Sequence, residues 1–294
     1  MARRAALVTG ASRGIGRATA LALARCGFEL WITARTQREG EGRVQASSSV
    51  RPKEVAVAGS LETTAAEIEA QGGVVHTVAM DLLDPASLDA MLARVEEQGA
   101  AVEVLVNNAI YQGAGRMDRL LDIPPEQFER LLHGNAFAQF LITRRVLRGM
   151  VERGAGTIVN MTSRSGHSDP PGAVGDGGWG YAYAASKSAF HRMVPILHHE
   201  HAADGIRAFN VDPGYTPTET MRALRGGQTD LDRAWAGAPV TVTAEVIAWL
   251  ATQPAADTHR GKTVNSHLLC AELGLVAGWD GERFRPPDGS EAQV

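Results

Sequence analysis

A tyrosine and a lysine four residues apart, Tyr183 and Lys187, have the spacing and the chemistry of a proton-transfer pair. On a helix this spacing places both side chains on one face, one turn apart. A phenol ordinarily titrates near pH ~10, but a fixed neighbouring cation favours the phenolate. We therefore expect the Lys187 ammonium to lie beside the Tyr183 phenol and to lower its pKa toward neutrality. The alternative is a helix in which Tyr183 packs and Lys187 is solvated.

A glycine-rich turn near the N terminus has the form of a phosphate-binding site. The apolar run 5–9 predicts a buried parallel strand, and a helical pattern follows the turn and ends at Gly27. Strand, glycine-rich turn and helix together present free backbone N–H groups and a helix N terminus to a diphosphate. A plain connection between strand and helix is the alternative. The cofactor-binding residues expected in this turn are Gly10, Ser12, Arg13, Gly14, Ile15 and Gly16.

The end of the second predicted strand, residues 28–33, bears on which dinucleotide binds. An acid at this place holds the ribose 2′-OH of NAD, whereas an arginine accommodates the 2′-phosphate of NADP. Here Ala34 is followed by Arg35, and Arg13 stands in the neighbouring turn, so two guanidinium groups could share one phosphate. The sequence therefore favours NADP(H), against the alternative of two solvated surface arginines.

The rest of the chain alternates predicted strands and helices in the manner of a parallel sheet covered on both faces. We expect a single-domain α/β protein with a Rossmann-type doubly wound parallel sheet of about seven strands. Further strands are expected at 74–80, 102–106, 156–161, 206–211 and 262–265. Residues 37–59 are expected to form an inserted surface loop, 215–240 a substrate lid, and 279–294 an extended C-terminal tail.

Polar residues follow several of these strands, where ligands bind in such sheets. Asp81 and Leu82 follow the third strand, and the Asp81 carboxylate is expected either to accept from an adenine amino group or to form a turn. Asn108 follows the fourth strand. A long helix is predicted from 124 to 153 and carries Asn135 among apolar neighbours. A buried asparagine must find partners, so it is either a satisfied core amide or part of a polar relay.

Composition excludes several classes of function. A formal charge of −4, with arginines interleaved with acids, gives no basic patch of the kind that nucleic acid requires. Cys26 and Cys270 are far apart and form no CxxC, so neither a disulfide framework nor a cysteine zinc site is indicated; Cys26 is expected in the core. No apolar segment is long enough to span a membrane and no signal peptide is evident, so we expect a cytoplasmic protein without membrane or nucleic-acid partners.

Together these residues resemble the classical short-chain dehydrogenase/reductase family over about residues 5–265. The segment Thr9-Gly10-x-x-x-Gly14-Ile15-Gly16 is similar to its cofactor turn, Asn107-Asn108-Ala109 to its N-N-A-G segment, and Tyr183-x-x-x-Lys187 to its active-site motif. Several motifs in this order, at nearly the family's intervals, are far more specific than any one of them.

The resemblance implies an NADPH-dependent carbonyl reductase, reversible as an alcohol dehydrogenase, acting on a largely apolar ketone or 3-oxoacyl-type substrate. Tyr183 is then the proton donor, with Lys187 biasing its phenol and holding the nicotinamide ribose. Ser163 is implied to hydrogen-bond the carbonyl oxygen, and Asn135 to order a water that completes a proton relay. The cofactor supplies hydride, so no metal is implied. Pro213, Gly214, Thr216 and Thr218 are implied to hold the nicotinamide end, and a homotetramer or dimer is implied by the same resemblance.

The sequence departs from the family pattern around this site. Ile110 stands where the family has glycine, and Ser163 and Tyr183 are further apart than usual because a loop rich in glycine, proline and aspartate separates them. These departures prompt a second hypothesis, a non-catalytic NADP(H)-binding or sensing protein on the same fold. It predicts tight NADPH binding without turnover.

Overall fold

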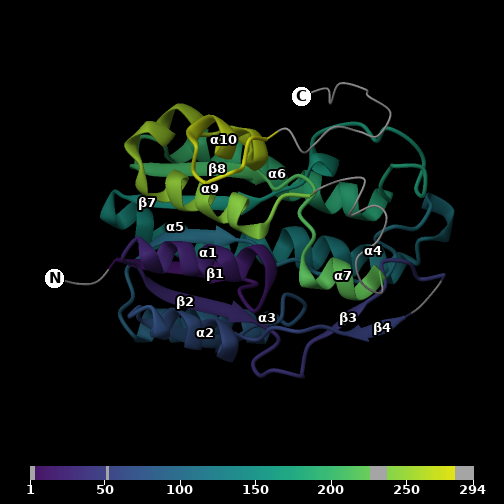
Figure 1. Ribbon diagram of the computed structural model, residues 1–294, viewed down its shortest axis with the longest axis horizontal. Coiled ribbons are helices and arrows are strands. Elements are labelled where there is room, and N and C mark those ends of the chain that lie inside the picture. The colour runs from purple at the N-terminus through teal and green to yellow at the C-terminus, as the bar shows by residue number, and fades with distance from the viewer. Residues whose placement is uncertain (1–3, 51–52, 226–236, 282–294) are drawn as a thin grey trace.

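A parallel sheet forms the centre of the computed structural model, which describes residues 4–50, 53–225 and 237–281 (Figure 1). The sheet has seven strands in the order β5-β2-β1-β6-β7-β8-β9, and every neighbouring pair is parallel. The order therefore reverses between β1 and β6, which is the point where ligands bind in doubly wound sheets. The strands are β1 Ala5–Thr9, β2 Glu29–Ala34, β5 Val75–Ala79, β6 Val102–Asn107, β7 Gly156–Met161, β8 Ile206–Asp212 and β9 Thr263–Asn265. This topology confirms the predicted fold class.

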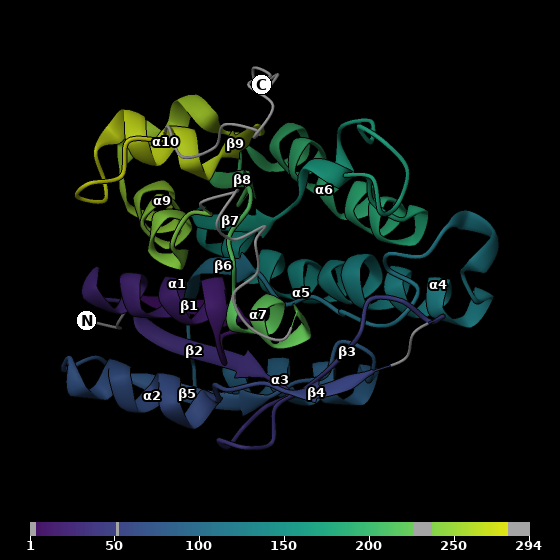
Figure 2. The ribbon, with the colours of Figure 1, turned by 45° about the vertical axis from the view of Figure 1, so that its right-hand side comes forward.

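Helices cover both faces of the sheet, as the view in Figure 2 shows. Those on one face are α1 (Gly14–Arg25), α2 (Leu61–Ala70) and α9 (Val240–Thr252); those on the other are α3 (Pro85–Glu97), α5 (Ala138–Arg153) and α6 (Tyr181–His201). The central strands are buried on both sides, which accounts for their nearly continuous apolar sequences.

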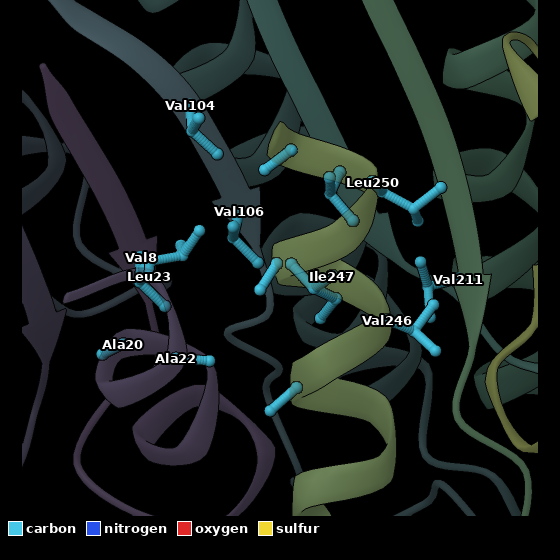
Figure 3. Close-up of a cluster of buried hydrophobic side chains, with 14 of the residues drawn as sticks. Val8, Ala20, Ala22, Leu23, Val104, Val106, Val211, Val246, Ile247 and Leu250 are labelled. Atoms are coloured by element: carbon cyan, nitrogen blue, oxygen red, sulfur yellow. The ribbon is translucent and has the colours of Figure 1, made fainter. Parts of the chain in front are cut away.

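Aliphatic side chains fill the layer between the sheet and the helices α1 and α9 (Figure 3). Val8 of β1, Val106 of β6 and Val211 of β8 pack there against Leu23 and Ile247, and all five are fully buried. Each such side chain stabilises the fold by about 1.5–3 kcal/mol relative to exposure. This packing holds the carboxyl ends of the central strands at fixed positions.

Residues 37–59 contain regular structure in addition to the predicted surface loop. Strands β3 (Arg43–Gln45) and β4 (Glu54–Ala56) pair antiparallel, and they lie beside helix α7 (Glu219–Arg225) in Figure 2. Val44 and Val57 are buried, so the segment has an apolar attachment to the rest of the molecule. We call residues 37–59 the hairpin insertion.

The long helix predicted from 124 to 153 is interrupted by a π-helical turn at His133–Phe137. It separates α4 (Pro125–Leu132) from α5, and Asn135 lies within it. Gly134 has its backbone so close to Tyr111 that an added Cβ would lie 2.7 Å from the Tyr111 Cβ. The wide turn therefore brings the helix backbone against the loop that follows β6.

The remaining elements complete the chain. The prediction for Cys26 is wrong, because α1 ends at Arg25 and Cys26 is exposed in the turn that follows. Much of the predicted lid, residues 226–236, and of the predicted tail, residues 282–294, lies outside the described residues. None of the helices in the described ranges is long and apolar enough to cross a membrane. The other elements are α10 (Ser266–Leu273) and the short 3₁₀ helices Leu120–Asp122, Arg164–Gly166 and Pro254–His259.

Candidate active site

A cavity of about 340 Å³ opens at the carboxyl ends of the strands, at the switch point between β1 and β6. Asn135 alone among the predicted site residues does not line it. Those that do are Gly10, Ser12, Arg13, Gly14, Ile15, Gly16, Arg35, Asp81, Leu82, Asn108, Ala109, Ser163, Tyr183, Lys187, Pro213, Gly214, Thr216 and Thr218. The fold therefore brings together residues separated by up to two hundred positions in the chain.

The glycine-rich turn is tied closely to the end of β6. The Asn108 amide donates to Thr9 O (2.9 Å) and Gly10 O (3.2 Å), and Gly10 has a φ of +70°. A Cβ on Gly16 would lie 2.3 Å from Gly10 O, so only glycine allows this approach. Arg13 occupies the N-cap of α1 without a side-chain cap, which leaves the first N–H groups of the helix open. An open helix N terminus behind a tight turn fits a diphosphate.

The two arginines predicted to share a phosphate differ in their surroundings. Arg35 is exposed, whereas Arg13 donates from Nε to Ala58 O (2.8 Å) and from Nη2 to Gly59 O (2.6 Å). Part of the Arg13 guanidinium is therefore engaged by the hairpin insertion. The insertion also brings Arg43 to a smaller cavity of about 180 Å³ that Arg13 and Arg35 line as well. Arg43 was not predicted as a site residue, because residues 37–59 were expected to form a surface loop and no motif in them indicated a position at the cavity.

Asp81 forms a turn, which is one of the two roles expected for its carboxylate. Its Oδ1 accepts from the backbone N–H of Leu83 at 2.9 Å, and its own N–H donates to Ser87 Oγ at 2.9 Å. The residue still lines the cavity with Leu82, so an adenine contact stays a prediction.

Tyr183, Lys187 and Ser163 meet at the inner end of the cavity. Tyr183 and Lys187 lie on α6, while Ser163 follows β7. Ser163 is hydrogen-bonded to Tyr183, and its Oγ accepts from the N–H (3.3 Å) and the hydroxyl (3.0 Å) of Ser165. Since its oxygen already accepts twice, the Ser163 hydroxyl uses its one proton as a donor to the phenol oxygen, which lowers the Tyr183 pKa. A substrate carbonyl would have to replace the phenol oxygen as the acceptor of this proton.

The expected effect of Lys187 on the phenol is not what the structure shows. Lys187 is buried and donates to Met161 O at 2.8 Å, and burial lowers its pKa to about 8, with Asp212 opposing the shift. Burial raises the pKa of Tyr183, and the cation that opposes this rise is Arg116, assisted by the Ser163 hydrogen bond. The desolvation cost of ionising the buried phenol therefore exceeds the stabilisation of the phenolate by Arg116 and Ser163.

Asn135 is a satisfied core amide. Its Oδ1 accepts from the Tyr111 N–H at 2.7 Å, and its Nδ2 donates to Ser186 Oγ at 3.2 Å and to Tyr111 O at 3.3 Å. These bonds fix the loop after β6 against α6 one residue before Lys187. Its part in a proton relay stays a prediction.

The loop after β8 closes the cavity from the opposite side. Thr216 donates to Pro213 O at 2.7 Å, and a Cβ on Gly214 would lie 2.7 Å from the His267 ring. Thr218 lies over Gly14, with its Cγ2 3.2 Å from where a Cβ on that glycine would stand. The loop therefore contacts the glycine-rich turn across the cavity mouth.

Arg116 is the residue at this site that sequence reasoning missed most clearly. It lines the cavity, and its guanidinium carbon lies 5.7 Å from the centre of the Tyr183 ring. It belongs to an irregular segment with no motif and no periodicity, so only the spatial structure could find it.

The sequence profile of the short chain dehydrogenase family matches residues 4–61 and 55–229 of this chain. The chain therefore belongs to the short-chain dehydrogenases and is an oxidoreductase acting on CH–OH or C=O groups.

Individual relatives agree with this family. A 3-oxoacyl-(acyl-carrier-protein) reductase from Synechocystis sp. is 31% identical over 262 residues, covering 88% of this chain and 94% of the relative. The solved structure of an actinorhodin polyketide ketoreductase variant with NADPH has a TM-score of 0.72 at 27% identity, covering 90% and 97% of the two chains. A gluconate 5-dehydrogenase from Burkholderia cenocepacia, solved with NADP and tartrate, has a TM-score of 0.69 at 25% identity, covering 90% and 94%.

Proposed function

We propose that this protein is an NADPH-dependent carbonyl reductase, reversible as an alcohol dehydrogenase. The observation that carries the proposal is that Ser163, Tyr183 and Lys187 line the same cavity as the glycine-rich turn. The relatives named for reducing 3-oxoacyl and polyketide carbonyls support a ketone as the substrate.

A nicotinamide dinucleotide fits the outer part of the cavity. The uncapped N terminus of α1 and the close approach of Gly16 to Gly10 suit a diphosphate. Four arginines and one acid, Glu54, line the neighbouring small cavity, and this excess of positive charge favours a 2′-phosphate and so NADP(H) over NAD(H). The arginines are Arg13, Arg35, Arg43 and Arg130. Two related structures are described as containing NADPH or NADP. NADPH bound there would supply a hydride to the carbonyl carbon.

The protein's own residues orient the carbonyl and handle the proton. Ser163 donates a hydrogen bond to the carbonyl oxygen, and Tyr183, kept protonated by its burial, donates the proton that oxygen requires. The buried Lys187 ammonium holds the ribose side of the site while anchored on Met161 O. Asn135 acts at a distance, by fixing the loop after β6 against α6.

Loss of NADPH absorbance with a panel of ketones tests the proposal. We expect Tyr183→Phe to lower kcat by about 100-fold or more, the usual contribution of a general acid, while the Kd for NADPH changes little. Tyr181→Phe is the matched control, because Tyr181 lies on the same helix but is 54% exposed. Equal turnover by Tyr183→Phe would disprove the mechanism. Tight NADPH binding without turnover of any carbonyl would favour the non-catalytic hypothesis.

A further inference from the structure

Arg116 gives the substrate end of the cavity a positive charge for which the described protein supplies no counter-ion. It has no ion pair with any described carboxylate, and its buried Nε has no hydrogen-bond partner. The Tyr183 ring is the neighbour that its guanidinium faces, at 5.7 Å. Arg116 is partly buried, and a buried donor such as its Nε is costly when it has no acceptor, since it loses its hydration. The position of Arg116 therefore lowers the stability of the folded protein.

Two segments fix the backbone on either side of Arg116. Met117 N–H donates to Ser47 O of the hairpin insertion at 3.0 Å, and the Asp118 carboxylate accepts from the N–H of Ser49 at 2.8 Å and from its hydroxyl. At the other side, Gly180 lies so close that an added Cβ would be 2.4 Å from Arg116 O. These partners belong to the hairpin insertion and to the enlarged loop before α6, and the second of these is a segment in which the sequence departs from the family pattern.

The charge balance of the inner cavity is positive. Arg116 and Lys187 both line it, and the Arg116 charge adds to the effect of burial in lowering the pKa of Lys187. The carboxylate of Asp212 also lines the cavity beside Lys187, and its negative charge raises the Lys187 pKa. A neutral, apolar ketone would leave the Arg116 charge unbalanced when it displaced water from the cavity. An anionic group would balance it.

We propose that Arg116 recognises a carboxylate of the substrate, so that the preferred substrates are short oxo acids and the corresponding hydroxy acids. The inference rests on the proposed reductase function and corrects its expectation of a largely apolar ketone. A planar carboxylate suits a guanidinium because two parallel N–H donors can meet its two oxygens. The position of Arg116 over the Tyr183 ring places that carboxylate a few bonds from a carbonyl oxygen held by Tyr183 and Ser163.

Binding of oxamate, an unreactive analogue of a short oxo acid, tests this recognition without turnover. Isothermal titration of the NADPH-loaded protein should show oxamate binding that is at least tenfold weaker, about 1.4 kcal/mol, in Arg116→Met. Arg116→Lys should retain part of the affinity as a point charge. Arg119→Met is the matched control, because it removes an equal charge from an exposed position three residues away. Ethyl oxamate, which lacks the carboxylate, should bind weakly and equally to all four proteins.

The outcomes separate this inference from the proposed function. If wild type reduces neutral ketones but Arg116→Met binds oxamate as well as wild type, the recognition is wrong and the reductase stands. If oxamate binding depends on Arg116 but no carbonyl compound is reduced, the recognition stands and the reductase fails. If Arg116→Met shifts only the pH profile of ketone reduction, Arg116 acts on the Tyr183 phenol and the inference is overturned.

Discussion

At the scale of single residues, the environment of Tyr183 decides the direction in which the site works best. Burial raises the pKa of its phenol, and the opposing effects of Arg116 and the Ser163 hydrogen bond do not cancel that rise. The phenol is thus protonated at neutral pH, which is the form that reduction of a carbonyl needs. Oxidation of an alcohol needs the phenolate instead.

The two directions should therefore respond differently to pH. Since kcat/KM reports groups of the free enzyme, the phenol should lower kcat/KM for reduction only above its ordinary value of about 10. Loss of the Lys187 proton, whose pKa is about 8, should cause an earlier and separate fall that is absent from Lys187→Met. For oxidation, kcat/KM should instead rise across neutral pH, by about tenfold per pH unit. Steady-state rates in both directions measure this. A plateau of the oxidation rate below pH 8 would mean that the phenol pKa is lowered, contrary to its burial.

Sequence reasoning identified the residues that belong to motifs and missed those that do not. The positions of Gly16 and Tyr183 in the cavity follow from spacing, because a strand–turn–helix unit and a helical four-residue interval have fixed geometry. Arg116 lies in an irregular loop, where no periodicity relates residue number to direction. The rise in the Tyr183 pKa was also unpredictable, because desolvation depends on how tightly the surroundings exclude water.

At the scale of elements, the hairpin insertion acts as a support for the loop that carries Arg116. Asp118 is only 4% exposed, and burial alone would raise the pKa of its carboxyl group. The hydrogen bonds from Ser48 and Ser49 outweigh that effect and hold the pKa below its usual value. The bonds between the insertion and Asp118 thus strengthen when the carboxylate is ionised.

Removal of one of these bonds should weaken the attachment. We expect Ser49→Ala to lower the free energy of unfolding by about 1–2 kcal/mol at pH 7, since a hydrogen bond to a charged group is lost. The depressed pKa stabilises the fold at neutral pH, and this contribution is lost as the pH falls below about 4. The difference between wild type and Ser49→Ala should therefore shrink in acid.

Urea unfolding at pH 7 and at acidic pH measures both parts of this prediction. Ser168→Ala is the control, because Ser168 is an exposed loop residue whose hydroxyl is hydrogen-bonded to the neighbouring His167 ring. A loss of stability for Ser49→Ala that stayed constant in acid would show that the Asp118 charge has no part in the attachment.

At the scale of the whole molecule, the alternation of strands and helices in the sequence was sufficient to predict the sheet. The buried strand β1 has a nearly continuous apolar sequence, and segments with a helical pattern separate it and the other strands. The connections between parallel strands of such units are nearly always right-handed. The hairpin insertion was expected as a loop, because its three-residue strands are too short to show an alternating pattern.

An exposed apolar groove on the helix side of the molecule predicts self-association. The groove, of about 1140 Å³, lies between α5 and α6. Phe137, Phe140 and Ile196 line it and are 47–49% exposed. Acids and arginines flank the same groove, so two copies related by a twofold axis could pair unlike charges around an apolar centre. These flanking residues are Glu129, Glu200, Arg144 and Arg192.

We therefore expect the protein to be a homodimer or homotetramer that Phe140→Asp converts to a smaller species. A carboxylate at this position would have to be buried unpaired against the second copy, which costs several kcal/mol. Sedimentation velocity of wild type and variant measures the change, and circular dichroism verifies that the variant is folded. Leu121→Asp is the control, because Leu121 is 97% exposed and lies away from the groove. A monomeric wild type, or equal dissociation by both variants, would rule out this groove as the interface. Because α6 carries Ile196 on its outer side and Lys187 toward the cavity, dissociation that also lowered kcat would link assembly to the site.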